Sequence, residues 1–185
     1  MGYMAKSSVK KPPGFELACV EGVFSVGSCV NDDFADYIDS WKHNGYWLFD
    51  SPEHIRQVAR EKSVTLDGAK LFYYEAYERE FDEKQMGWSA FAPESRLTTN
   101  VAVPEEKRLE GFDLVTFYAR SSPECSPLSC CGVAQEVPVN EHCIMRTFDE
   151  AKAALEEGKF SRVEPGPYRI FAVYSVEWPG RSENL

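Results

Sequence analysis

The residues best suited to chemistry gather in one proline-rich segment, residues 121–147, which reads SSPECSPLSCCGVAQEVPVNEHCIMRT. It holds four of the six cysteines and one of the three histidines: Cys125, Cys130, Cys131, Cys143 and His142. Thiolate and imidazole are the donors from which proteins build tetrahedral zinc sites. The segment lacks a C-x-x-C pair, and neighbours such as Cys130 and Cys131 point to opposite sides of an extended chain. A zinc site here would combine Cys125, one of Cys130 and Cys131, and His142 or Cys143.

The same segment also suggests a cysteine nucleophile. Cys125 lies between two prolines in PECSP, and a cysteine beside an imidazole or a positive charge is held as the reactive thiolate at neutral pH. His142 is the candidate catalytic base for Cys125, and Arg120 or Arg146 is a candidate holder of an anionic group. A third interpretation is that the cysteines are small apolar residues filling a loop folded onto the core. No nucleophile motif of a known family is matched, and all three interpretations stay open.

The balance of charge limits the class of partner. Asp and Glu outnumber Lys and Arg by 30 to 20, which gives a formal net charge of −10. Proteins that bind nucleic acid or anionic membranes need clustered basic residues, so we expect neither as a partner. The densest acidic run is either a soluble surface or a face for a basic protein partner. It consists of Glu75, Glu78, Glu80, Asp82 and Glu83.

Three functions from different classes are therefore considered. The first is a protein-binding or regulatory module with an acidic, aromatic-rich surface, because 14% of the residues are aromatic and this function requires no further motif. The second is a zinc-binding domain that uses the Cys/His-rich loop 125–143, with zinc as the one cofactor indicated. The third is a cysteine-nucleophile enzyme centred on Cys125.

We expect one cytoplasmic domain. A chain of 185 residues is long enough for a single well-buried core. Residues 1–14 contain no apolar run of the length that a secretory signal needs, and no later stretch approaches a membrane span. The uneven spacing of the cysteines differs from the frameworks of small secreted domains, which favours reduced thiols. The sequence predicts a flexible arm at residues 1–14, an α+β domain at 15–180 and a tail at 181–185.

Hydrophobic periodicity and turn residues indicate an α+β fold, with a mixed or antiparallel sheet and flanking helices. Helices are predicted after Asn31, after Asp50 or Ser51 with Pro52 in the first turn, and from Phe148 to about Glu157, where Thr147 and Glu150 form a capping box. Strands are predicted at Phe15–Phe24, Tyr46–Phe49, Leu71–Tyr77, Phe112–Ala119, His142–Met145 and Tyr168–Trp178. The last strand is apolar on both faces, which favours a central position in the sheet. Residues 84–111 are predicted to form a long irregular connection with an edge strand around Val101 and Val103.

The two halves of the chain resemble each other. Gly14-Phe15-Glu16-Leu17 matches Gly111-Phe112-Asp113-Leu114 at an offset of 97 residues. At an offset of 99, the Phe-Asp pair at residues 49–50 matches that at 148–149, and the stretches LFYYEAY and RIFAVYS overlap. We predict half-repeats at residues 14–80 and 111–178, forming two βαβ-like units about a pseudo-twofold axis. The cysteine loop takes the place of a helix in the second half, and such a replaced element is where function is expected.

Overall fold

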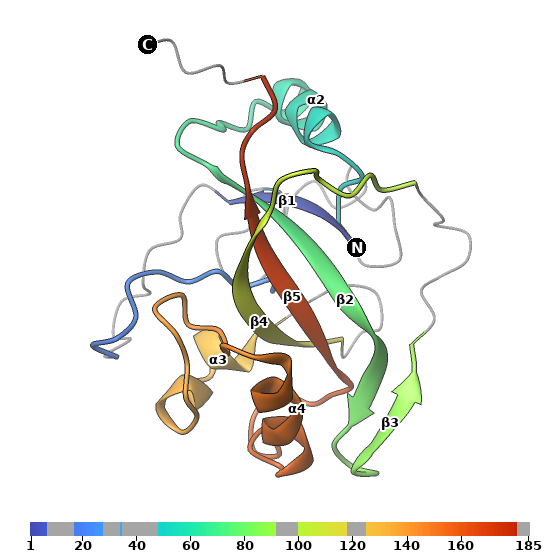
Figure 1. Ribbon diagram of the computed structural model, residues 1–185, viewed down its shortest axis with the longest axis vertical. Helices are drawn as coiled ribbons and strands as arrows, with labels where there is room; N and C mark the ends of the chain where they lie inside the picture. The colour runs from blue at the N-terminus through green and yellow to red at the C-terminus, as the bar shows by residue number, and fades with distance from the viewer. Residues whose placement is uncertain (7–16, 28–33, 35–47, 92–99, 118–124, 181–185) are drawn as a thin grey trace.

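The computed structural model describes residues 1–6, 17–27, 34, 48–91, 100–117 and 125–180 (Figure 1). The strands within them are β1 (Gly2–Lys6), β2 (Lys70–Asp82), β3 (Gly87–Ala90), β4 (Arg108–Thr116) and β5 (Tyr168–Val176). The helices are α2 (Pro52–Lys62), α3 (Pro127–Cys130) and α4 (Phe148–Glu156), with a 3-10 helix, η3, at Val133–Gln135. None of these helices has the length and apolar character needed to cross a membrane.

The strands form a five-stranded sheet in the order β1-β2-β5-β4, with β3 paired to the end of β2. Every pairing is antiparallel, and Tyr74 of β2 faces Val173 of β5 near the middle of the central pair. In Figure 1, α2 lies toward one end of this central pair, and α3 and α4 lie toward the other. The α+β class predicted from the sequence is therefore confirmed, and the sheet is antiparallel. β5 is flanked by strands on both sides, as its apolar faces predicted.

The two longer helices begin where their capping residues predicted. The side chain of Ser51 accepts a hydrogen bond from the amide of His54 at 3.2 Å, and Pro52 occupies the first turn. Thr147 and Glu150 form both hydrogen bonds of a capping box at the start of α4. These bonds satisfy amides that have no partner within the helix. The cap therefore fixes the chain just before each helix packs on the sheet.

The N-terminal segment differs from the expected flexible arm. Gly2–Lys6 pairs with β2 over its whole length, and all five residues are buried. The Lys6 ammonium, which suggested a solvated arm, donates to the carbonyl of Gly27 at 3.0 Å. Residues 7–14 of the predicted arm lie outside the described residues.

Two predicted strands are irregular segments instead. In Leu17–Phe24 and in His142–Met145 no regular strand forms, and Met145 makes an isolated bridge with Phe112. The two segments bond to each other, because the amides of Glu21 and Phe24 donate to the carbonyls of Glu141 and His142 at 2.8 and 3.1 Å. The apolar residues of both segments predicted that they would be buried, and most of them are. Their backbone groups form hydrogen bonds between the two loops instead of with a strand of the sheet.

Two further predictions concern the connection at residues 84–111 and the helix after Asn31. The connection at residues 84–111 is not wholly irregular, since β3 folds back on β2 with Trp88 opposite Phe81. No strand forms at Val101–Val103. The helix predicted after Asn31 lies outside the described residues, apart from the buried Phe34.

The same backbone arrangement occurs at both outer strands of the sheet, β1 and β4. Tyr3 of β1 exchanges two hydrogen bonds with Phe49, at 2.8 and 2.9 Å, and Phe112 of β4 exchanges two with Met145, also at 2.8 and 2.9 Å. Two residues after each bridge stands an N-cap, Ser51 or Thr147, and then a helix. Each helix is followed by one of the two central strands, β2 or β5.

The buried residues form two hydrophobic clusters. One joins β1, α2 and the first half of β2, and includes Phe49, Ile55 and Phe72. The other joins β4, β5, α3, η3 and α4, and includes Leu114, Leu128 and Leu155. The second cluster supports the cysteine loop, because Leu128 of α3 is fully buried in it.

Candidate metal centre

Three potential metal ligands converge beside the end of β4: Cys125, Cys131 and Glu164. Each offers one ligand atom, and the three atoms lie within 4.8 Å of one another. The sulfurs of Cys125 and Cys131 are 3.9 Å apart. Two thiolates bound to one tetrahedral zinc, with Zn–S bonds of about 2.3 Å, would have sulfurs about 3.8 Å apart. The observed separation would suit two thiolates on a common ion, and it also suits a weak thiol–thiol hydrogen bond.

Cys125 is fixed by the last residue of β4. The amide of Thr116 donates to the carbonyl of Cys125 at 2.8 Å, which forms an isolated bridge at the edge of the sheet. The next residue, Ser126, is buried and donates its hydroxyl to Asp113 at 2.6 Å. Both bonds anchor the start of the loop to a regular strand.

A single helical turn brings Cys131 back to Cys125. Ser126 stands at the N-cap of α3 and Cys131 at its C-cap, where the Cys131 amide donates to the carbonyl of Pro127 at 3.1 Å. The buried side chain of Leu128 holds this turn against the core. One turn of helix is short enough that the residues flanking it lie side by side.

The main chain around Glu164 is held from two sides. The hydroxyl of Tyr168 donates to the carbonyl of Glu164 and, at 3.4 Å, to that of Phe160. The carboxylate of Glu83 accepts from the amide of Gly166 at 2.9 Å. The Glu164 side chain itself is exposed, so its carboxylate faces the two thiols from the solvent side.

Asp113 ties the cysteine loop to a second loop. It is fully buried, and its carboxylate accepts four hydrogen bonds, from the hydroxyls of Ser25 and Ser126 and from the amides of Val26 and Leu114. Burial raises the pKa of the Asp113 carboxyl, and these hydrogen bonds act in the opposite direction. Asp113 therefore serves as a scaffold for the site.

The electrostatic surroundings keep Cys125 protonated in the absence of a cation. Burial raises the pKa of the Cys125 thiol, and the nearby Cys131, Glu164 and Asp113 raise it further. A reactive cysteine needs a lowered pKa, supplied by a positive neighbour or a helix N-terminus. These surroundings do not favour an activated nucleophile at Cys125.

The other predicted site residues lie elsewhere. Cys130 is disulfide-bonded, so its sulfur is not a thiolate ligand in this structure, and the expectation of reduced thiols does not hold for it. Cys143 is buried and its thiol donates to the carbonyl of Leu128 at 3.5 Å. His142 Nε2 lies 3.2 Å from Glu110 Oε2, and its ring stacks on Phe24. Within the described residues, neither Cys143 nor His142 belongs to the converging group.

Arg120 and Arg146 are the two residues that the sequence suggests as holders of an anionic group. Arg146 is exposed, and Arg120 lies outside the described residues. The sequence does not indicate Glu164 as a ligand, because Glu164 follows Cys131 by more than thirty residues and stands in a proline-glycine turn, EPGP, that indicates only a bend. No spacing rule links it to the cysteines.

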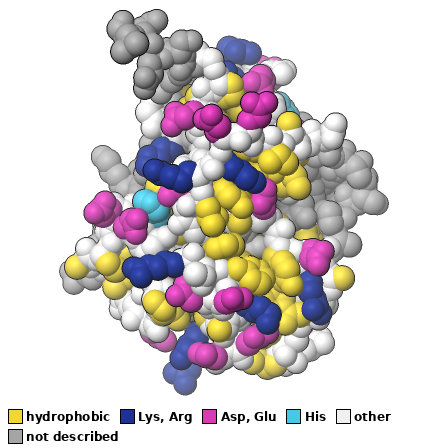
Figure 2. All heavy atoms as spheres, in the orientation of Figure 1, with side chains coloured by type: hydrophobic (Ala, Val, Ile, Leu, Met, Phe, Trp, Pro, Cys, Tyr) yellow, Lys and Arg dark blue, Asp and Glu magenta, His cyan; other side chains and the backbone are white. Residues whose placement is uncertain are grey.

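The predicted acidic face is partly neutralised by basic side chains. Glu75 pairs with Lys107, and Glu80 pairs with Arg169 at 2.7 Å. The Arg169 guanidinium also lies against the rings of Phe91 and Phe117. Figure 2 shows positive and negative side chains interspersed on the face in view, without a broad area of one sign. Binding of a basic protein partner stays a prediction. These ion pairs within the chain do not support it, because they already neutralise two of the acidic side chains.

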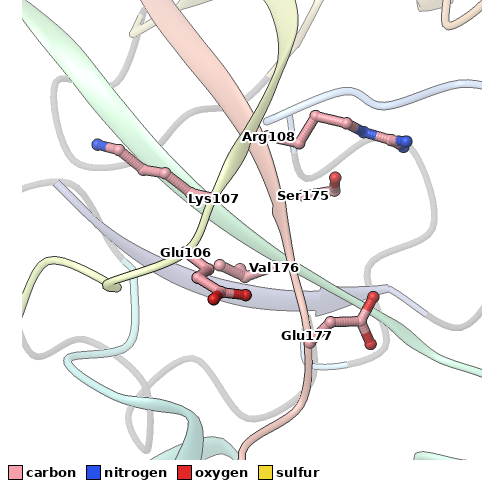
Figure 3. Close-up of a pocket in the computed structure, with 6 residues that line it drawn as sticks. All are labelled: Glu106, Lys107, Arg108, Ser175, Val176 and Glu177. Atoms are coloured by element: carbon pink, nitrogen blue, oxygen red, sulfur yellow. The ribbon is translucent and has the colours of Figure 1, made fainter.

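One surface pocket is separate from the thiols. It is lined by Glu106, Lys107, Arg108, Ser175, Val176 and Glu177. Figure 3 shows the side chains of Lys107 and Arg108 pointing in opposite directions, so the two do not converge on one anion. Nearby, the half-buried Glu110 accepts hydrogen bonds from Ser175 and Arg108. The charged groups around this pocket therefore pair with one another at the surface.

Comparison of the chain with protein-family models, curated proteins and solved structures gave no match. Function therefore has to be inferred from the side chains and their geometry.

Proposed function

We propose that this protein binds a thiophilic divalent metal ion, zinc in the first place, between Cys125 Sγ, Cys131 Sγ and a carboxylate oxygen of Glu164. The observation that carries the proposal is the 3.9 Å separation of the two sulfurs, with a carboxylate oxygen within 4.8 Å of both. A weak thiol–thiol hydrogen bond would also suit that separation. It would not require a third anionic donor converging on the same point.

The donor types favour zinc among the common metals. Thiolates select zinc and other soft or borderline ions, whereas magnesium and calcium bind sites made wholly of oxygen. The single carboxylate makes the set less suited to a monovalent soft ion such as copper(I), which prefers sulfur throughout. A disulfide at Cys130 is compatible with the site, because that sulfur is not among the three donors.

A bound ion would join two segments that follow different strands. Cys125 and Cys131 belong to the segment after β4, and Glu164 belongs to the loop that enters β5. β4 and β5 are adjacent in the sheet. The metal would therefore cross-link the loops at one end of this strand pair and add its binding energy to the stability of the fold.

We also propose that the two halves derive from one duplicated unit. Tyr74 faces Val173, and these positions are related by the offset of 99 seen in the sequence. Gly2 pairs with Tyr74, and Gly111 pairs with Val173. In a duplicated unit, the counterpart of Gly111-Phe112 is therefore Gly2-Tyr3. It is not Gly14-Phe15, the match found in the sequence. The metal site belongs to the second half: its two cysteines lie in the segment that connects β4 to α4, and Glu164 lies in the loop between α4 and β5.

Metal analysis of protein purified without chelator tests the metal proposal. About one zinc per chain is expected, and Cys125→Ser and Cys131→Ser should each abolish it. Cys19→Ser is the matched control, because Cys19 is an exposed thiol outside the site and its loss should leave the metal content unchanged. A folded wild-type protein that neither contains zinc nor takes it up on addition would overturn the proposal.

A further inference from the structure

We infer that the metal at Cys125, Cys131 and Glu164 keeps one coordination position for a ligand from outside the chain, and that this ligand is a neutral nitrogen donor such as an imidazole rather than an anion. The inference rests on the proposed function and names the class of ligand that the same site would take.

The number of protein donors is the first step. Within the described residues, the converging group contains three ligands. Structural zinc sites are closed by four protein ligands, whereas sites that exchange ligands hold zinc with three and leave the fourth position to water or substrate. The two sulfurs and one oxygen found among the described residues correspond to the second kind.

Neighbouring polar groups are already engaged. The Tyr168 hydroxyl donates to the carbonyls of Phe160 and Glu164. The Ser126 hydroxyl donates to Asp113, and the Asp113 carboxylate accepts four hydrogen bonds in full burial. Each would have to give up a buried hydrogen bond to reach a metal, which is costly. They are therefore poor candidates for the fourth ligand.

The site is open to a ligand from solvent. Glu164 is exposed, and Cys125 and Cys131 are each partly exposed. Structural zinc centres are shielded by the chain that folds around them. Partial exposure of all three donors gives an external group a path to the ion.

Charge then selects the class of ligand. Two thiolates and one carboxylate carry three negative charges, so a divalent ion leaves the centre with a net charge of about −1. The buried carboxyl of Asp113 lies near Cys125 and adds no positive charge to the centre. An anionic fourth ligand is repelled by this centre, whereas a neutral imidazole is not. The imidazole of histidine is the commonest neutral nitrogen donor in proteins.

Cobalt(II)-loaded protein tests the inference, because tetrahedral cobalt(II) thiolate sites absorb visible light and report changes of ligand. At about pH 8, where imidazole is mostly neutral, imidazole should shift the cobalt bands and saturate. Azide should bind at least about tenfold more weakly, as expected for two like charges a few ångströms apart. Absence of any spectral response to imidazole, or azide binding as tightly as imidazole, would overturn the inference.

Glu164→Gln supplies the matched control for charge. This variant removes one negative charge from an exposed side chain. The ratio of the azide to the imidazole dissociation constant should therefore decrease, while the thiolate-to-cobalt charge-transfer bands are retained. An unchanged preference would contradict the charge argument. Cobalt binding with thiolate charge transfer but no effect of imidazole would remove this inference alone. Failure of the wild-type protein to bind cobalt or zinc would remove the proposed function as well.

Discussion

The hydroxyl of Ser126 donates to the carboxylate of Asp113 at 2.6 Å in the fully buried interior. This bond joins the residue after Cys125 to the middle of β4, and the same carboxylate accepts the amide of Val26 at 2.8 Å. Two loops that are distant in sequence are thus held by one side chain. The position of Cys125 depends on this buried carboxylate as much as on the sheet.

Asp113→Asn should change how stability depends on pH. Because burial raises the folded-state pKa of Asp113 above its unfolded value, the native state holds this proton more tightly than the unfolded state does. The contribution is present below the unfolded pKa and is lost as pH rises through the folded pKa. The free energy of unfolding of the wild type, relative to Asp113→Asn, should therefore fall as the pH rises above the unfolded pKa of about 4.

Urea unfolding at a series of pH values checks this difference. Asp113→Ala is the severe variant, since it leaves buried donors without an acceptor and should cost about 3 kcal/mol. A wild-type stability that rose with pH relative to Asp113→Asn would contradict the raised pKa.

Tyr168→Phe should weaken metal binding without unfolding the protein. The change removes the hydroxyl that holds the carbonyl of Glu164, while the fully buried ring keeps its place in the core. Loss of such a supporting hydrogen bond typically lowers metal affinity by a factor of about 10 to 100. Competition with a chromophoric chelator measures the affinity, and an unchanged value would show that the loop needs no such support.

Glu83 offers an independent test of the same loop. Glu83→Gln keeps an oxygen acceptor for the amide of Gly166, whereas Glu83→Leu removes it. Affinity should be retained in the first variant and reduced in the second. Equal affinities in the two variants would mean that Glu83 does not position Glu164.

Gly111→Ala should destabilise the fold strongly. Gly111 has φ +148°, and a Cβ there would lie 2.5 Å from the carbonyl oxygen of Met145, which bonds to the next residue, Phe112. Strain of this kind costs at least about 1–3 kcal/mol. Gly132→Ala is the control: its φ is +74°, but no atom lies within 4 Å of the added methyl group. Equal stabilities of the two variants in urea would contradict the close approach of Gly111 to the Met145 carbonyl.

How far the sequence predicted this structure depends on how local each signal was. The capping residues Ser51 and Thr147 placed two helices correctly, because a cap is recognised within four residues. The aromatic strand at Leu71–Tyr77 and the apolar strand at Tyr168–Trp178 were equally local signals, and they formed the core of β2 and β5.

Features that depend on distant partners were missed. β1 forms because Tyr3 pairs with both Tyr73 and Phe49, and five residues beside a run of lysines carry no sign of those partners. The group of Cys125, Cys131 and Glu164 also depends on residues that are distant in the sequence. Cys125 and Cys131 were candidates by residue type, but Glu164 joins them only because Tyr168 and Glu83 hold its loop.

Zinc should stabilise the protein in proportion to its affinity. At a free zinc concentration about 100 times the dissociation constant, the gain is about 2.7 kcal/mol, which corresponds to a rise in Tm of about 5–10 °C for a chain of this size. Thermal unfolding with zinc and with chelator measures the difference. Cys125→Ser should show the same Tm under both conditions, and a rise in that variant equal to the wild type's would place the zinc elsewhere.

Zinc-edge X-ray absorption on the zinc-loaded protein tests the metal centre most directly. Binding at Cys125, Cys131 and Glu164 predicts two sulfur neighbours at about 2.3 Å and two oxygen or nitrogen neighbours at about 2.0 Å. A first shell with four sulfurs, or with none, would contradict a centre built from these two thiolates and one carboxylate.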